Sequence, residues 1–277
     1  MSAGQQKRWF ITGISTGFGR ELARAVAQSG EKVLGTVRKA AQIAELAAEG
    51  IDAIVMDVND QVAVDEGVRA ATERLGGIDV LVNNAGFGMV GAIEALSLDE
   101  VRAVMETNFF GVLRVTQALI PAMRAGGGTI VMISSMAGQI GFAGAGAYCA
   151  SKFALEGLSD ALGEELAPFG VNVLIVEPGA FRTDFAGRSM LAAEGSVDAY
   201  AGMQAGEAKH RAASYSGSEP GDPVKGAQAI VDIIRAGNMP RRLALGEDAV
   251  NGMLHKLANV KNDVETWRQA SLGTAFA

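Results

Sequence analysis

Short apolar runs alternate with longer amphipathic stretches along the first 180 residues. The apolar runs are rich in valine, isoleucine and leucine, as strands covered on both faces of a parallel sheet are. They predict strands at 8–12, 32–37, 51–56, 78–83, 129–134 and 171–177. Between them the pattern predicts helices at about 18–29, 40–48, 60–75, 98–124 and 148–168. Several of these helices are followed by a glycine that suits a left-handed cap, namely Gly30, Gly50, Gly76 and Gly170.

This alternation predicts right-handed crossovers between parallel strands. After Pro178 the pattern loosens, with a helix near 223–236, a short strand near 242–245 and a helix near 247–258. The fold class is therefore α/β, a doubly wound, Rossmann-like parallel sheet of about seven strands with helices on both faces. A ligand is expected at the carboxyl ends of the strands.

The chain is expected to form a single dinucleotide-binding and catalytic domain over residues 1–277. Residues 184–222 are rich in glycine, alanine, serine and methionine, and a surface segment of that length without strong structure is either disordered or a functional lid. We favour a substrate lid hinged near 178–179. The last fifteen or so residues suit either a tail or an oligomer contact.

Composition and charge limit where the protein is expected to act and what it is expected to bind. The only cysteine, Cys149, excludes an intrachain disulfide, and the N-terminal residues lack the apolar run of a secretory signal, so we expect a cytoplasmic protein. The net charge of −7 argues against general nucleic-acid binding. Residues 125–151 contain no charged side chain, but glycines and polar residues interrupt them too often for a membrane span.

The first strand runs into the glycine-rich turn T-G-I-S-T-G-F-G at 12–19, which opens a helix. Its glycines permit a tight turn and close approach to a pyrophosphate, which a helix N-terminus attracts. The G-x3-G-x-G spacing departs from the usual dinucleotide fingerprint, and an ordinary turn between strand and helix stays an alternative.

Three further strand ends carry candidate cofactor contacts. The second strand ends at Arg38 and Lys39, and no carboxylate stands there. Arg38 is therefore expected to bind a 2′-phosphate and to favour NADP(H) over NAD(H). The alternative is that the two cations are only a solvated pair. Asp57 follows the third strand and suits either an adenine amino group or a helix N-cap. After the fourth strand, the asparagines of N-N-A-G at 83–86 can hydrogen-bond the backbone groups that are left unpaired where the chain leaves the sheet.

Tyr148 and Lys152 stand four residues apart, which places them on one face of a helix. A free phenol titrates near ~10, and a neighbouring ammonium is expected to lower that value and make the tyrosine an acid/base group. A lone pair of this spacing also occurs on helix surfaces. Ser135 and Asn108 complete the candidate catalytic set.

Together these residues resemble the short-chain dehydrogenase/reductase family. The resemblance covers roughly 8–180 and rests on T-G-x3-G-x-G, N-N-A-G, Asn108, I-S-S at 133–135, Y-x-A-S-K at 148–152 and P-G at 178–179. It implies that Tyr148 is the general acid or base, that Lys152 lowers its pKa and bonds the nicotinamide ribose, and that Ser135 holds the substrate oxygen. It further implies that Asn108 anchors a water and that the P-G-x3-T segment contacts the nicotinamide. The implied cofactor-binding residues are Gly13, Ser15, Thr16, Gly17, Phe18, Gly19, Arg38, Asp57, Val58, Asn84, Ala85, Gly86, Tyr148, Lys152, Pro178, Gly179 and Thr183.

The expected function is hydride transfer between NADP(H) and a carbonyl or secondary alcohol, on a small substrate that is uncharged or weakly polar. A catalytically idle nucleotide sensor or scaffold is the main alternative, and an epimerase or dehydratase ranks lower. The resemblance implies a homodimer or homotetramer, for which helices 98–124 and 148–168 are long enough. Neither histidine shows metal-ligand spacing, so no metal is expected. Six side chains suit either a substrate pocket or packing, namely Met89, Phe142, Phe181, Phe185, Met190 and Met203.

Overall fold

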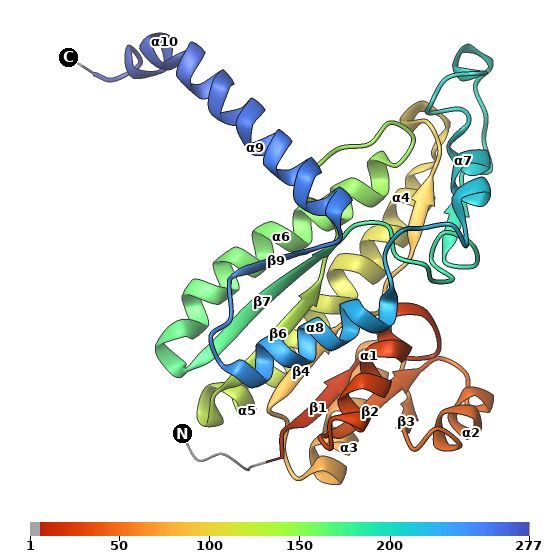
Figure 1. Ribbon diagram of the computed structural model, residues 1–277, viewed down its shortest axis with the longest axis vertical. Helices are drawn as coiled ribbons and strands as arrows, with labels where there is room; N and C mark the ends of the chain where they lie inside the picture. The colour runs from red at the N-terminus through yellow and green to blue at the C-terminus, as the bar shows by residue number, and fades with distance from the viewer. Residues whose placement is uncertain (1–5, 277) are drawn as a thin grey trace.

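A computed structural model describes residues 6–276. Within them, seven parallel strands form one sheet in the order β3-β2-β1-β4-β6-β7-β9 (Figure 1). The strands are β1 (Arg8–Ile11), β2 (Lys32–Val37), β3 (Asp52–Val55), β4 (Val80–Asn83), β6 (Gly128–Ile133), β7 (Val171–Pro178) and β9 (Arg242–Leu245). The fold class predicted from the sequence is confirmed, and the strands start and end within two residues of their predicted limits.

Helices cover both faces of the sheet (Figure 1). Their bounds are α1 (Gly17–Gln28), α2 (Ala41–Ala47), α3 (Gln61–Leu75), α4 (Leu98–Met105), α5 (Val112–Gly126), α6 (Gly146–Leu166), α7 (Ala208–Tyr215), α8 (Pro223–Ala236), α9 (Glu247–Thr266) and α10 (Arg268–Leu272). Short 3₁₀ turns lie at Ile93–Ala95, Met136–Gly138, Ala167–Phe169 and Asp198–Tyr200. No helix in the described part of the chain combines the length and apolarity that crossing a bilayer requires.

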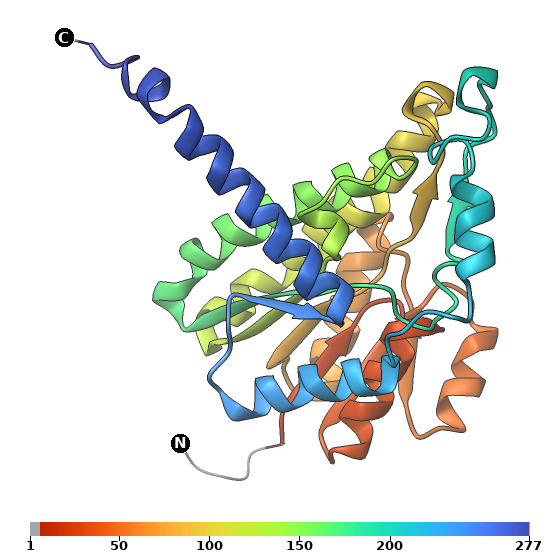
Figure 2. The same cartoon turned by 45° about the horizontal axis from the view of Figure 1, so that its top comes forward.

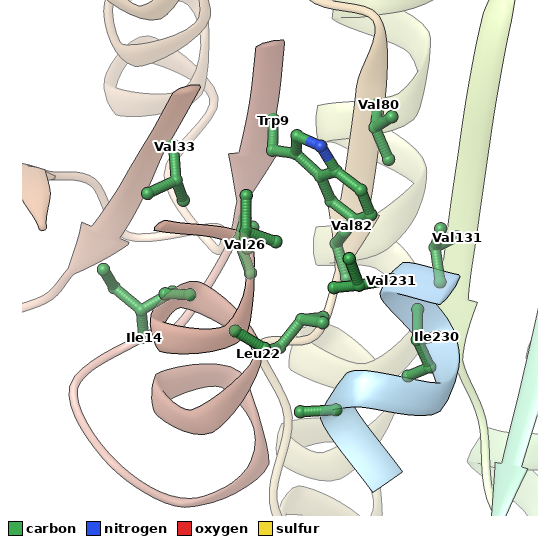
Figure 3. Close-up of a cluster of buried hydrophobic side chains, with 14 of the residues drawn as sticks. Trp9, Ile14, Leu22, Val26, Val33, Val80, Val82, Val131, Ile230 and Val231 are labelled. Carbon is green, nitrogen blue, oxygen red and sulfur yellow. The ribbon is translucent and has the colours of Figure 1, made fainter. Parts of the chain in front are cut away.

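Each face of the sheet has its own apolar core, because successive strand residues point to opposite sides. Trp9 of β1 packs with Leu22 of α1 and Val231 of α8 on one side (Figure 3). Its neighbour Phe10 packs with Leu119 of α5 and other residues of α3 and α6 on the other side. The alternating pattern of the first strand therefore fixes which helices lie on which face.

The strand order reverses between β1 and β4, so the loops after these two strands diverge to opposite faces. A crevice opens at such a switch point, beyond the carboxyl ends of the strands. The glycine-rich turn follows β1 and the N-N-A-G segment follows β4. The topology thus brings Gly13 and Asn84 together, although they lie 71 positions apart in the chain.

Three predicted elements need correction. The helix expected over 98–124 is two helices, α4 and α5, joined by the π-helical segment η2 (Glu106–Gly111). The segment 184–222 is not without structure, since it contains α7 and the short strand β8 (Met190–Ala192), which pairs in parallel with β5 (Gly88–Val90). The helix expected to end at 258 continues to Thr266 and extends away from the body of the protein (Figures 1 and 2).

Candidate active site

The glycine-rich turn folds tightly because two of its glycines adopt positive φ. Gly13 has φ +70°, and a Cβ there would lie 2.9 Å from the Cα of Ala85. Gly17 has φ +62° and begins α1. Thr16, the N-cap, makes no side-chain capping hydrogen bond, so the first N–H groups of α1 are left for another acceptor. An uncapped helix N-terminus of this kind suits a phosphate group.

Asn84 holds this turn against the end of β4. Its Nδ2 donates to the carbonyl oxygens of Thr12 and Gly13, both at 2.9 Å. A Cβ on Gly19 would lie 2.2 Å from the same Nδ2, so this glycine leaves the space that the asparagine occupies. The expectation that the N-N-A-G asparagines bond backbone groups is confirmed for Asn84, whereas Asn83 donates to the hydroxyl of Thr116 at 2.9 Å.

A cavity of about 1040 Å³ extends from the glycine-rich turn to Tyr148. All seventeen residues expected to bind the cofactor line it. Arg38 is exposed at its rim, and within residues 6–276 it forms no salt bridge, so its guanidinium is available to an anion. Asp57 is not the N-cap of α3: Asp60 fills that role, accepting from the backbone N–H groups of Val62 and Ala63.

Tyr148, Lys152 and Ser135 meet at the far end of the cavity. The two α6 side chains lie on one helix face, with Lys152 Nζ 5.9 Å from the centroid of the Tyr148 ring. Ser135 follows β6, lines the same cavity as Tyr148, and donates its hydroxyl to the carbonyl oxygen of Pro178 at 3.4 Å. Lys152 Nζ donates to the carbonyl oxygen of Ile133 at 2.8 Å. The fold therefore brings these three groups together at the carboxyl edge of the sheet, as their order in the chain predicts.

The pKa of Tyr148 is not lowered by the neighbouring Lys152, contrary to the prediction from the sequence. Burial raises the pKa of Tyr148 to about 12, and the opposing effect comes from its hydrogen bond with Ser135 rather than from Lys152. Burial also lowers the pKa of Lys152 to about 8, while the charge of Glu156 raises it. The physical reason is that both groups are desolvated, which disfavours the charged form of each. The lysine is therefore close to its own titration at neutral pH.

Asn108 lies behind the cavity, within the π-helical segment, and is fully buried. Its Nδ2 donates to the carbonyl oxygen of Phe87 (2.9 Å) and to Ser151 Oγ (3.0 Å), and its Oδ1 accepts from the Phe87 N–H (3.0 Å). These bonds tie the loop after β4 to α6 next to Lys152. The extra residue of a π turn commonly marks a functional position in a helix. The role of Asn108 as a water anchor stays a prediction.

The segment after β7 is held by the start of α9. Asp248 Oδ2 accepts from the Ala180 N–H at 2.7 Å, and a Cβ on Gly179 would lie 2.1 Å from Asp248 Oδ1. Gly179 is thus required by the approach of this carboxylate as well as by its place in the cavity wall. The sequence did not indicate Asp248, because its partner lies 68 residues away.

The segment predicted to be a lid contacts both ends of the cavity. The ring of Phe185 packs against that of Tyr148, with centroids 5.6 Å apart. Arg188 Nη2 donates to Thr16 Oγ1 in the glycine-rich turn. The sequence did not indicate Arg188, since nothing in its local pattern marks a contact with a residue 172 positions away. Arg188 places a cation beside the turn that suits a phosphate.

Four of the six side chains considered for a substrate pocket line the cavity, namely Phe142, Phe181, Phe185 and Met190. Met89 is instead buried in a separate apolar cluster, and Met203 is exposed outside the cavity. Neither histidine belongs to the cavity wall that residues 6–276 form. Cys149 is buried inside α6, where burial raises the pKa of its thiol. The substrate end of the cavity is therefore formed mainly by aromatic and small residues.

The parallel sheet with its glycine-rich turn before α1 fits an oxidoreductase acting on CH–OH or C=O groups, of a family that uses nicotinamide cofactors. The family model described as short chain dehydrogenase matches residues 7–193, and the chain belongs to this family.

Relatives match nearly the full chain. It is 36% identical over 274 residues to the oxidoreductase BOA17 of Botryotinia fuckeliana, covering 97% of this chain and 99% of that protein. It is also similar to the crystal structure of a short-chain dehydrogenase from Streptomyces avermitilis, with TM-score 0.90, 42% identity and coverage of 98% and 100%. A single-residue variant of actinorhodin polyketide ketoreductase, solved with NADPH, has TM-score 0.73, 30% identity and coverage of 90% and 99%.

Proposed function

We propose that this protein transfers hydride between NADP(H) and a ketone, aldehyde or secondary alcohol, with Tyr148 as general acid or base. The observation that carries the proposal is the meeting of Tyr148, Ser135 and Lys152 in the same cavity as the uncapped N-terminus of α1. One end of the cavity suits a phosphate and the other suits proton exchange with an oxygen.

In the reductive direction a bound nicotinamide supplies hydride to the carbonyl carbon. The Tyr148 hydroxyl gives its proton to the carbonyl oxygen, and the Ser135 hydroxyl donates a hydrogen bond to the same oxygen. Lys152, with a pKa of about 8, is largely charged at neutral pH and stabilises the phenolate that remains. Oxidation of an alcohol reverses the proton transfer.

The preference for NADP(H) is proposed on the charge at the adenosine end. Arg38 follows β2, where an acidic residue would select the unphosphorylated cofactor. A guanidinium forms a charge-assisted fork with a phosphate. The ketoreductase that resembles this chain at 30% identity was solved with NADPH, which supports this choice.

The proposed substrate is uncharged and carries an apolar group next to its carbonyl. Phe142, Phe185 and Met190 line the substrate end of the cavity, and apolar walls of this kind select by burial of apolar surface. We further propose that residues 1–277 act as one domain in which 184–222 closes over the substrate. A cytoplasmic location and a homodimer or homotetramer remain predictions, and Phe110 and Phe153 are exposed on the helical layer suggested as an interface.

Oxidation of NADPH over a panel of aldehydes and ketones tests the function. Tyr148→Phe removes one hydroxyl and should reduce turnover at least about a hundredfold, while the dissociation constant of NADPH stays within about twofold. Thr72→Val removes one hydroxyl from α3, outside the cavity and outside the proposed lid, and should leave turnover unchanged. Full activity in Tyr148→Phe would refute the assignment. NADPH binding with no turnover on any carbonyl or alcohol would favour the alternative, a nucleotide sensor.

A further inference from the structure

Helix α9 leaves the body of the protein almost at once. Its first turn packs against the sheet edge, where Ala249 is buried, but from Leu254 onward every residue of the helix is exposed. Figures 1 and 2 show the helix extending away from the other elements in both views. A helix of 20 residues spans about 30 Å, so most of its length has no partner within residues 6–276.

The exposed helix carries an apolar stripe in a heptad pattern. Val250, Leu257 and Val264 recur every seven residues, and Met253, Val260 and Trp267 follow each of them by three. These are the a and d positions of a coiled coil. Leu257 is 61% exposed, Val264 65% and Trp267 67%, which is unusual for a continuous stripe on a helix that has only water around it.

We propose that α9 pairs with α9 of a second copy of this chain, antiparallel, about a two-fold axis between Ala258 and Asn259. In this register every core layer is apolar. Val250 faces Trp267 of the second copy, Met253 faces its Val264, and Leu257 faces its Val260. The two-fold axis repeats each layer, so six layers run along the helix pair.

The charges beside the stripe favour the antiparallel direction. The residues that flank the core in antiparallel pairs are g with g and e with e. In the proposed register Lys256 meets Asp263 of the second copy, and Glu247 meets its Arg268, so opposite charges face each other in both sets. A parallel pair would keep Asp263 beside Arg268 but would place Lys256 beside Lys261 of the other helix. Only the antiparallel pair is free of a like-charge contact.

This interface differs from a contact through α5 and α6, and it does not depend on the proposed enzymatic function. The beginning of α9 also lies close to the substrate end of the site. A Cβ on Gly252 would lie 3.1 Å from Cε of Met136, a residue that lines the cavity. Pairing therefore brings Trp267 of the second copy near the part of the helix that borders the cavity wall. The surface adjoins the catalytic half of the molecule.

Mass in solution tests the interface. The double variant L257K/V260K places four lysines in the central layers and should halve the mass of the native assembly measured by light scattering. Asn262→Lys adds the same kind of charge on the outer face of α9 and should leave the mass unchanged. A monomeric parent protein, or a parental mass in L257K/V260K, would overturn the proposal. Circular dichroism at matched concentration checks that both variants are folded.

Charge reversal tests the direction. Lys256→Glu should raise the dissociation constant of the pair about tenfold, because both symmetry-related contacts with Asp263 become repulsive. Asp263→Lys should do the same, and K256E/D263K should restore parental affinity. In a parallel pair Lys256→Glu would strengthen association by removing the repulsion from Lys261, so tighter binding in this variant refutes the antiparallel register.

Cross-linking provides a second measure of direction. A mixture of Met253→Cys and Val264→Cys proteins should form a disulfide between unlike copies. Val264→Cys alone should form none, since its two-fold partner is Met253. Efficient cross-linking of Val264→Cys to itself would mean that the helices pair in parallel.

Discussion

A buried carboxyl group beside the cavity wall should contribute stability that is lost as the pH rises. Glu177 lies near the end of β7 with no exposed surface, just before Pro178. Its Oε1 accepts from Gln139 Nε2 at 3.0 Å, and Arg242 Nε lies 3.5 Å away. Burial, followed by the neighbouring charge of Glu156, raises the pKa of Glu177 to about 7. Gln139 and Arg242 only partly offset this effect.

The direction follows from proton uptake. A carboxyl group with a pKa near 7 when folded and 4.5 when unfolded binds more protons in the folded state between these values. The contribution of Glu177 to the stability of the fold is therefore complete below the pKa of the unfolded state. It is lost as the pH rises from that value through 7. A shift from 4.5 to about 7 corresponds to ~3 kcal/mol at 1.36 kcal/mol per unit, an upper limit because Glu177 and Glu156 share Arg242.

Glu177→Gln removes the titration and keeps an oxygen that accepts from Gln139. The free energy of unfolding of both proteins is measured by urea titration at pH 5, 6.5 and 8. The difference, variant minus parent, should become more positive by ~2 kcal/mol from pH 5 to pH 8. Glu165→Gln changes an exposed carboxyl on α6 and should stay within ~0.5 kcal/mol of the parent at each pH. A difference between Glu177→Gln and the parent that is the same at pH 5 and pH 8 would refute the reasoning.

Two further predictions concern the cavity. Arg188→Ala should weaken NADPH and NADH about equally, because its guanidinium lies against Thr16 in the turn at 12–19, whereas Arg38→Ala should weaken NADPH by at least about tenfold more than NADH. Calorimetric titration of both cofactors checks this, and loss of discrimination in Arg188→Ala would contradict it. Reductase activity should fall above about pH 8 as Lys152 loses its charge, and Glu156→Gln should move that fall to lower pH because the carboxylate raises the pKa of the lysine. A pH–rate profile unaffected by Glu156→Gln would count against this.

Most of the sheet and much of the site were predictable from the sequence. The central strands could be located because they are buried on both faces and therefore continuously apolar, as Trp9 and Phe10 in β1 show by packing on opposite faces. The candidate catalytic pair could be located because Tyr148 and Lys152 share one helix turn, so their spacing alone determines that they meet. Local rules suffice where the interacting residues are neighbours in the chain.

Other features depend on contacts that no local pattern reveals. The π turn around Asn108 is compensated by hydrogen bonds to Phe87 and Ser151, which lie 21 and 43 residues away. The pairing of β5 with β8 joins short strands from distant parts of the chain. The pKa of Lys152 depends on how deeply the fold buries it, and spacing gives no information about desolvation. Tertiary structure decides all three.

The buried carboxylates also explain how the lysine keeps its charge. Desolvation lowers the pKa of Lys152, and the charge that raises it is that of Glu156, one turn further along α6. Gln139 bonds both Glu156 and Glu177, and Arg242 lies beside both, so the two carboxyls form one buried group. Replacing that group with apolar residues would stabilise the fold at neutral pH but leave a desolvated ammonium without a counter-charge. Within this group it is the charge of Glu156, rather than that of Glu177, that raises the pKa of Lys152 and so favours the protonation state that the proposed chemistry requires.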